Sequence, residues 1–164
     1  MNLKPIPNYE GYSFDLNNNQ VYSHYKKKYR KLNVNVRGYY YIQLWKNSKI
    51  KTLQLHRLIY EMYNGTIPEK MFIDHIDCNI LNNNITNLRL ANKSQNSCNI
   101  KTKKNNLSTG HKNIYQRHKY NTYEVKIYKN GKRVYYKTFK TLEEAIINRD
   151  IKLKEIHGEF ANLG

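Results

Sequence analysis

The sequence predicts an α+β protein, and three local patterns support this fold class. Residues 5–52 alternate short strand-like runs with turns. Asn130-Gly131 separates two further strand-like runs, which is typical of a tight β-hairpin. Thr141-Leu142-Glu143-Glu144 has the pattern of a capping box, so a helix should begin there. Strands therefore dominate the first part of the chain, and strands followed by one helix form the last part.

The N-terminal part is expected to be rich in β-structure. Residues 38–45 and 50–55 are two strand-like runs joined by a short polar turn. A helix is expected over residues 56–63, ended by Asn64-Gly65. Its prediction rests on apolar residues that recur at helical spacing, at Leu55, Leu58, Ile59 and Met62.

The C-terminal part predicts a three-stranded antiparallel sheet packed on one helix. Residues 111–118, 122–129 and 132–139 read as strands, and the helix that Thr141 caps should end at Gly158. The apolar residues on one side of this helix are Leu142, Ala145, Ile146, Leu153 and Ile156. Such a stripe needs a sheet to pack against, so the strands and the helix should form one module.

The charge of the chain indicates a polyanionic partner. Lys and Arg number 29 against 12 Asp and Glu, which gives +17 and makes nucleic acid the first candidate. A basic loop in the N-terminal part either contacts phosphate or is a solvated turn. Its candidate DNA-binding residues are Lys26, Lys27, Lys28 and Arg30.

One face of the C-terminal sheet should be basic and aromatic. If Val125 and Ile127 face the helix, together with Ile114, Val134 and Tyr136, the alternation of strand residues exposes the others. The candidate DNA-binding residues on that face are Tyr115, Arg117, Lys126, Tyr128, Arg133 and Tyr135. Such a face can enter a major groove, and the alternative is a scaffold for protein contacts.

The central segment combines groups suited to phosphate chemistry. Phe72-Ile73 is an apolar strand end that would deliver Asp74, an oxygen ligand for a divalent ion, and His75, a base titrating near neutrality. Residues 88–90 read as a return strand, and a short helix from about Ser94 would carry Asn96 inward as a second oxygen ligand. Arg89 either contacts phosphate in DNA or pairs with Asp77.

This segment resembles the HNH nuclease family, most closely its phage homing endonucleases. The resemblance rests on Asp74-His75, the Asn-rich loop 77–83, Asn87-Leu88-Arg89-Leu90 and Gln95-Asn96. Leu90 stands where the family usually has Trp, and Asn96 where many members have His.

The resemblance implies a ββα-metal fold that holds one divalent metal ion, Mg²⁺ or Mn²⁺. It also implies site-specific, homing-type cleavage of double-stranded DNA. One active site per chain suggests a monomer that nicks one strand and needs no obligate protein partner, since a double-strand break would need dimerisation or a second event. His75 would be the general base and Asn87 would fix the loop and orient His75, while Asp74 and Asn96 would hold the metal. His56, in Leu55-His56-Arg57-Leu58, also matches the family and is expected to have a structural role.

Residues 111–164 resemble the APETALA-type DNA-binding domain of plant ethylene-response factors (AP2/ERF). The resemblance rests on Asn130-Gly131-Lys132-Arg133, the capping box at Thr141 and the end of the chain from Gly158 to Leu163. The expected organisation is therefore a DNA-contacting β-rich module over 1–54, an HNH nuclease over 55–100, a basic linker over 101–110 and this domain over 111–164.

Two further observations bear on location and on the alternatives. Cys78 and Cys98 form no Cys-x-x-Cys pair and no apolar run approaches membrane-spanning length, so an intracellular protein without membrane contact is expected. It would work in the cytoplasm or nucleus of a cell that carries a phage, virus or mobile element. Two other functions stay open: a DNA-binding regulator with an inactive HNH core, and a binder of structured RNA.

Overall fold

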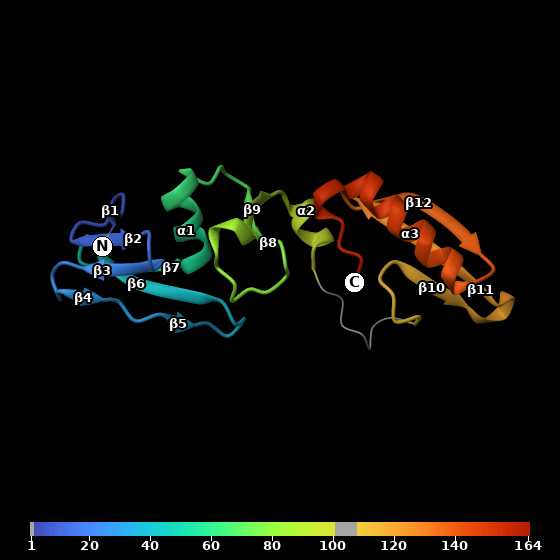
Figure 1. Ribbon diagram of the computed structural model, residues 1–164, viewed down its shortest axis with the longest axis horizontal. Coiled ribbons are helices and arrows are strands. Elements are labelled where there is room, and N and C mark those ends of the chain that lie inside the picture. The colour runs from blue at the N-terminus through green and yellow to red at the C-terminus, as the bar shows by residue number, and fades with distance from the viewer. Residues whose placement is uncertain (1, 101–107) are drawn as a thin grey trace. The chain divides into compact units, whose positions relative to one another are not determined.

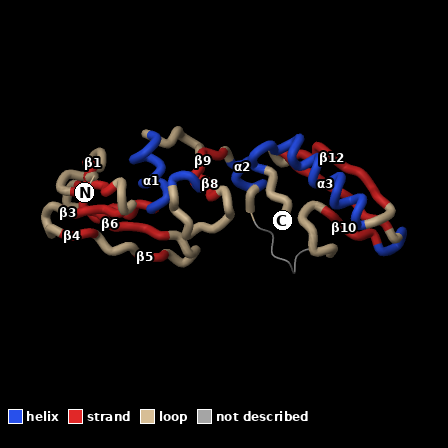
Figure 2. Tube along the Cα trace, viewed as in Figure 1, coloured by secondary structure: helices blue, strands red, loops and turns tan. Residues whose placement is uncertain are grey.

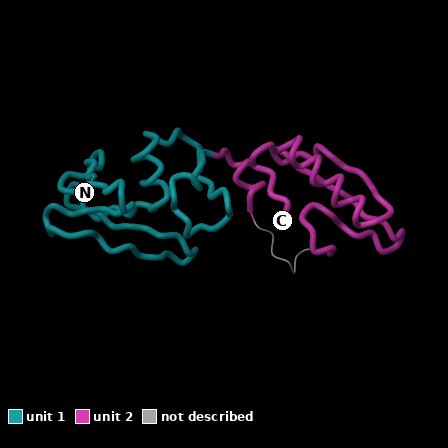
Figure 3. Tube along the Cα trace, in the orientation of Figure 1, with its two compact units in different colours: residues 1–90 teal, residues 91–164 magenta. Residues whose placement is uncertain are grey.

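The computed structural model describes residues 2–100 and 108–164, in which strands and helices form two separate units. The units are Met1–Leu90 and Ala91–Gly164 (Figure 3). Most of the expected linker, residues 101–107, lies outside the described residues. The division into four functional segments stays a prediction.

Two small antiparallel sheets open the first unit (Figure 1). One has the order β1-β2-β3-β4 and the other the order β5-β6-β7, and every neighbouring pair is antiparallel. The strands are β1 (Leu3–Pro5), β2 (Tyr12–Asp15), β3 (Gln20–Ser23), β4 (Lys28–Tyr29), β5 (Asn33–Val34), β6 (Tyr40–Lys46) and β7 (Lys49–Gln54). The predicted strands near residues 38–45 and 50–55 are thus confirmed as β6 and β7.

Helix α1 (Leu55–Asn64) follows β7 directly and connects these sheets with the central segment. The four apolar residues that predicted it are all buried, and Gly65 follows its end with a φ of 86°. A two-stranded sheet comes next, made of β8 (Phe72–His75) and β9 (Leu88–Ala91), with the 3₁₀ turn η1 (Ile85–Asn87) before β9.

One hydrophobic core holds the first unit together. Phe14 of β2, Ile42 of β6, Ile59 of α1, Ile73 of β8 and Leu88 of β9 belong to the same buried cluster. Residues on both sides of position 54 therefore pack into one core. The strand end that carries Asp74 and His75 is anchored through Ile73 to the N-terminal sheets.

The second unit contains a three-stranded antiparallel sheet covered by one long helix (Figure 2). Its elements are α2 (Lys93–Cys98), β10 (Ile114–Arg117), η3 (His118–Tyr120), β11 (Thr122–Lys129), β12 (Lys132–Phe139), α3 (Leu142–His157) and η4 (Gly158–Phe160). Ile114, Val125 and Ile127 pack with Ala145 and Leu153 of α3 in a separate core. The predicted α+β class is confirmed.

The local signals in the second unit act as expected. Asn130 and Gly131 have φ values of 52° and 77°, the left-handed backbone that a two-residue hairpin turn requires. The Thr141 hydroxyl accepts a hydrogen bond from the backbone N of Glu144 at 3.2 Å, which caps α3. In the part of the chain that the structure describes, no helix is both long and apolar enough to cross a membrane.

Candidate active site and nucleic-acid surface

Asp74 and His75 lie at the end of β8, where both side chains are buried. Their exposed fractions are 6% and 5%. Asp74 Oδ2 accepts a hydrogen bond from Arg89 Nε at 2.9 Å, and β9, which carries Arg89, is the neighbouring strand. The predicted pairing of Arg89 with Asp77 is therefore wrong, since the paired strands bring Arg89 to Asp74. The ion pair supplies the counter-charge that a buried carboxylate needs.

Asn87 closes the loop between β8 and β9. Its Oδ1 accepts from the backbone N of Asp77 at 3.0 Å, and its Nδ2 donates to Asp77 Oδ1 at 2.9 Å and to the carbonyl of Asn82 at 2.8 Å. Burial acts to raise the pKa of Asp77, but hydrogen bonds from Asn82, Asn79 and Asn87 outweigh it and lower that pKa. Asn87 is thus placed to fix the loop.

The imidazole of His75 is held by Asn83 and not by Asn87. His75 Nε2 and Asn83 Oδ1 are 3.0 Å apart, whereas the side-chain hydrogen bonds of Asn87 go to Asp77 and Asn82. The prediction that Asn87 orients His75 by direct hydrogen bonding is corrected accordingly. Asn83 was missed because it is the middle residue of an Asn82–Asn84 run, in which no pattern marks the residue that turns inward.

Asn96 lies on α2, in the second unit. Asn92 caps this helix: its side chain accepts from the backbone N of Gln95, and the Gln95 side chain accepts from the backbone N of Asn92. Asp74 belongs to the first unit, so the shared ligand role of Asp74 and Asn96 stays a prediction.

The chemistry of these donors suits a hard divalent cation. Among the described residues, no three His, Cys, Asp or Glu side chains gather around a possible metal position. The Asp74 carboxylate is nevertheless the kind of ligand that suits Mg²⁺, which commonly binds one or two carboxylates and completes its shell with water and substrate phosphate.

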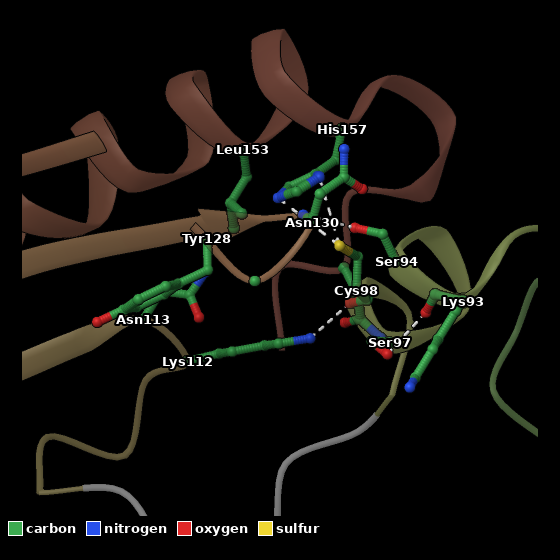
Figure 4. A pocket seen from close by; sticks show the side chains of 12 residues that line it. Lys93, Ser94, Ser97, Cys98, Lys112, Asn113, Tyr128, Asn130, Leu153 and His157 are labelled. Carbon is green, nitrogen blue, oxygen red and sulfur yellow. Dashed lines mark hydrogen bonds between the residues drawn. The ribbon is translucent and has the colours of Figure 1, made fainter. Parts of the chain in front are cut away.

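Helix α2 packs against the rest of the second unit (Figure 4). Ser94 Oγ accepts from the backbone N of Asn130 at 3.0 Å, and Cys98 Sγ lies 3.3 Å from Nδ1 of His157. Burial raises the pKa of Cys98 and lowers that of His157, so both side chains favour their neutral forms. These contacts, which the sequence did not reveal, attach the helix that carries Asn96 to the hairpin and to the end of α3.

The face of the C-terminal sheet opposite α3 is organised around a buried carboxylate. Glu124 is 3% exposed; its Oε2 forms an ion pair with Lys126 Nζ at 2.7 Å, and its Oε1 accepts a hydrogen bond from the Tyr136 hydroxyl at 2.7 Å. Arg117 Nε lies 3.4 Å from the same carboxylate. The contact with the Lys126 ammonium and the hydrogen bond from Tyr136 are the main reasons that the pKa of Glu124 is lowered. We call this surface the outer sheet face, and its residues are Tyr115, Arg117, Glu124, Lys126, Tyr128, Arg133 and Tyr136.

The predicted orientation is wrong for Tyr135 and Tyr136. Tyr135 is paired with Ile127 and packs against the core on the α3 side, whereas Tyr136 is paired with Lys126 on the outer sheet face. Tyr128 is paired with Arg133 after a register shift that inserts Val134 as an extra residue. Because of this bulge, Arg133 lies on the outer sheet face as predicted, over the Tyr136 ring at 5.0 Å. After the bulge, Tyr135 and Tyr136 face the sides opposite to those predicted.

The basic residues of the N-terminal part lie in the turn between β3 and β4, in β4 and directly after it. Lys26, Lys27 and Lys28 are exposed, while Arg30 turns back and donates to the carbonyl of Gln43 at 3.3 Å. The three lysines are therefore accessible to phosphate, and Arg30 has a structural contact that the sequence did not suggest.

Comparisons with known proteins agree with this site. Residues 53–98 match the family model of the HNH endonuclease. The uncharacterized HNH endonuclease L560 of Acanthamoeba polyphaga mimivirus is 40% identical over 110 residues, 66% of this chain and 56% of that protein. Protein 3.8 of Escherichia phage T7 is 38% identical over 112 residues, 68% of this chain and 90% of that protein.

A homing endonuclease is similar in both sequence and structure. DNA endonuclease I-HmuI of Bacillus phage SP01 is 39% identical over 89 residues, 54% of this chain and 51% of that protein. The sequence matches thus span only about half of I-HmuI and of L560. A structure that describes DNA binding and cleavage by the HNH homing endonuclease I-HmuI superposes with a TM-score of 0.52 at 25% identity, covering 96% of this chain and 91% of that one.

The family match covers β8, the loop, β9 and α2, the same elements that carry Asp74, His75, Asn87 and Asn96. This match shows that residues 53–98 form an HNH endonuclease domain.

Proposed function

We propose that the protein is a metal-dependent, site-specific DNA endonuclease of the homing type that nicks one strand. The observation that carries the proposal is the placement of Asp74 and His75 at a buried strand end, beside a loop locked by Asn87, within the segment that matches the family. The similarity to I-HmuI, whose structure describes DNA binding and cleavage, supports DNA as the substrate.

His75 would take the proton from the attacking water. Histidine is the side chain that most often acts as a general base, and the contact of His75 with Asn83 fixes its ring. The water oxygen would bond to phosphorus while the bond to the 3′-oxygen breaks, which leaves a 5′-phosphate and a 3′-hydroxyl. Asn87 would contribute indirectly, by holding the loop that contains Asn83.

Asp74 and Asn96 would hold the divalent ion, Mg²⁺ or Mn²⁺. When bound, this ion supplies electrostatic stabilisation of the charge that develops on the phosphate and on the leaving oxygen. Arg89 would hold Asp74 in place through the 2.9 Å contact, and we assign it this role ahead of the predicted phosphate contact.

Binding to double-stranded DNA would involve surfaces outside the catalytic segment. The exposed lysines at 26–28 and the outer sheet face carry positive charge and tyrosine rings, which suit phosphate and base contacts. Three strands and one covering helix are also what an APETALA-type (AP2/ERF) domain would need, so we propose that residues 111–164 bind DNA in that manner.

We further propose that the protein acts as a monomer without an obligate protein partner. Relatives from phages and from a giant virus suggest that it works in a cell carrying such an agent.

A nicking assay tests the proposal. Supercoiled plasmids that carry a library of random inserts are incubated with the protein and Mg²⁺ or Mn²⁺. We expect nicked circles from a subset of inserts and none in the presence of EDTA. Binding without nicking in either metal would instead support a DNA-binding regulator with an inactive core. Stronger competition by structured RNA than by duplex DNA at matched salt would refute DNA as the partner.

A further inference from the structure

Two aromatic rings lie against the imidazole of His75, and they come from other elements. Tyr39 immediately precedes β6 and His56 is the second residue of α1. The ring centroids of His56 and His75 are 5.2 Å apart, those of Tyr39 and His56 are 5.2 Å apart, and those of Tyr39 and His75 are 6.2 Å apart. Each ring is therefore within aromatic packing distance of the other two.

The turn that presents Tyr39 is tightly fixed. Asn35 Oδ1 accepts hydrogen bonds from the backbone N of Arg37 at 2.9 Å and of Tyr39 at 3.1 Å. Gly38 has a φ of +85°, and a Cβ at this position would lie only 3.1 Å from Ile80 Cδ1. The turn thus lies directly against the loop that also carries Asn83. A side chain at position 38 would strain the backbone and would require the Ile80 side chain to shift slightly.

The imidazole of His75 is consequently held in two ways. Asn83 bonds to its Nε2 atom at 3.0 Å, and the rings of Tyr39 and His56 limit its rotation by contact. His56 is itself 6% exposed, so it has little freedom to move away.

We propose that Tyr39 and His56 are positioning residues, which hold the His75 imidazole in the orientation that proton abstraction requires. The inference rests on the proposed nuclease function. It assigns the N-terminal module a part in the reaction as well as in DNA contact, because Tyr39 belongs to that module. A shift of the general base by about 1 Å can lower a rate by about 100-fold, so loss of this packing should be visible in turnover.

The test compares Tyr39→Leu, which removes the ring, with Tyr39→Phe, which keeps it and removes only the hydroxyl. His56→Leu is the second ring-removing variant, and it serves if Tyr39→Leu does not fold. For each folded variant, single-turnover cleavage, DNA affinity and the His75 ring signals in ¹⁵N NMR are measured.

We expect Tyr39→Leu to cleave at least tenfold more slowly than the parent with DNA affinity within twofold. Its His75 ring signals should broaden or double, while Tyr39→Phe should behave like the parent in all three measurements. Cleavage by both ring-removing variants at the parent rate, with a single sharp His75 signal, would overturn the inference. Equal loss in Tyr39→Phe and Tyr39→Leu would also overturn it, because the hydroxyl would then be the important group.

A failure of the proposed function is distinguishable from these results. If the parent does not cleave any DNA, the nuclease proposal fails, but the His75 ring signals still report whether Tyr39 and His56 hold the imidazole.

Discussion

Replacing Asn87 by alanine should destabilise the first unit by about 2 kcal/mol. The substitution removes three side-chain hydrogen bonds, with lengths of 3.0, 2.9 and 2.8 Å, that connect the end of the loop to Asp77 and Asn82. At about 1 kcal/mol for each bond, the loss would be about 3 kcal/mol. Asp77 is exposed, so water can hydrogen-bond to its backbone N and its carboxylate in the variant and reduce the loss to about 2 kcal/mol. The loss is not reduced further because Asn87 is only 8% exposed and its removal leaves a buried gap.

The fluorescence of Trp45 can follow this change in urea. Trp45 is the only tryptophan in the sequence and lies on β6, so its emission reports on the first unit. With a denaturant slope of about 1 to 2 kcal/mol per molar urea, the midpoint should fall by about 1 to 2 M. The slope itself should stay constant, because the buried surface of the folded unit is nearly unchanged.

Asn79→Ala is the matched control in the same loop. Asn79 is exposed and its side chain accepts one hydrogen bond, from the backbone N of Leu81 at 3.2 Å. Its loss should therefore cost less than about 1 kcal/mol. Equal midpoints for Asn87→Ala and the parent would refute the reasoning, as would an equal effect of the two alanine substitutions.

Three further outcomes follow from the contacts of single residues. Burial, the charge of His75 and that of Arg57 lower the pKa of His56 to about 4, so on acidification the unfolded chain takes up a proton before the folded one does. The free energy of unfolding should therefore fall by about 3 kcal/mol as the pH drops from about 6.5 to 4. Urea titrations at several pH values would measure this fall, which should be smaller in His56→Leu. Arg89→Met should destabilise the first unit by about 3 kcal/mol because it removes a buried cation from beside Asp74. Millimolar Mg²⁺ should raise the melting temperature of this variant more than that of the parent, and equal shifts would contradict a cation site at Asp74. Glu124→Gln removes a carboxylate from the outer sheet face and should tighten binding to random duplex DNA at low salt in fluorescence anisotropy, and unchanged binding would mean that this face does not meet DNA.

Strong local signals made much of the fold predictable. Asn130-Gly131 adopts the left-handed turn that its sequence favours, Thr141 caps α3, and the spacing of Leu55, Leu58, Ile59 and Met62 placed α1 within one residue at each end. Each of these features depends on a few neighbouring residues. The same holds for Asp74-His75, whose place at a strand end follows from the apolar residues before it.

The features that the sequence did not reveal depend on register or on distant contacts. A bulge at Val134 sets the orientation of Tyr135 and Tyr136, and a run of Val, Tyr and Lys gives no sign of it. Arg89 meets Asp74 because β8 and β9 are paired, whereas spacing along the chain allowed Asp77 equally well. The packing of Tyr39 on His75 joins residues far apart in the chain, which no local pattern could indicate.

The nicking rate of His75→Ala tests the central claim most directly. Parent and variant are compared on the same supercoiled plasmid, at protein concentrations that saturate the DNA, with Mg²⁺ present. If His75 is the general base, the variant should bind DNA as the parent does and nick it at least about 100-fold more slowly. Nicking by His75→Ala at the rate of the parent would contradict the assignment of the catalytic centre to Asp74 and His75.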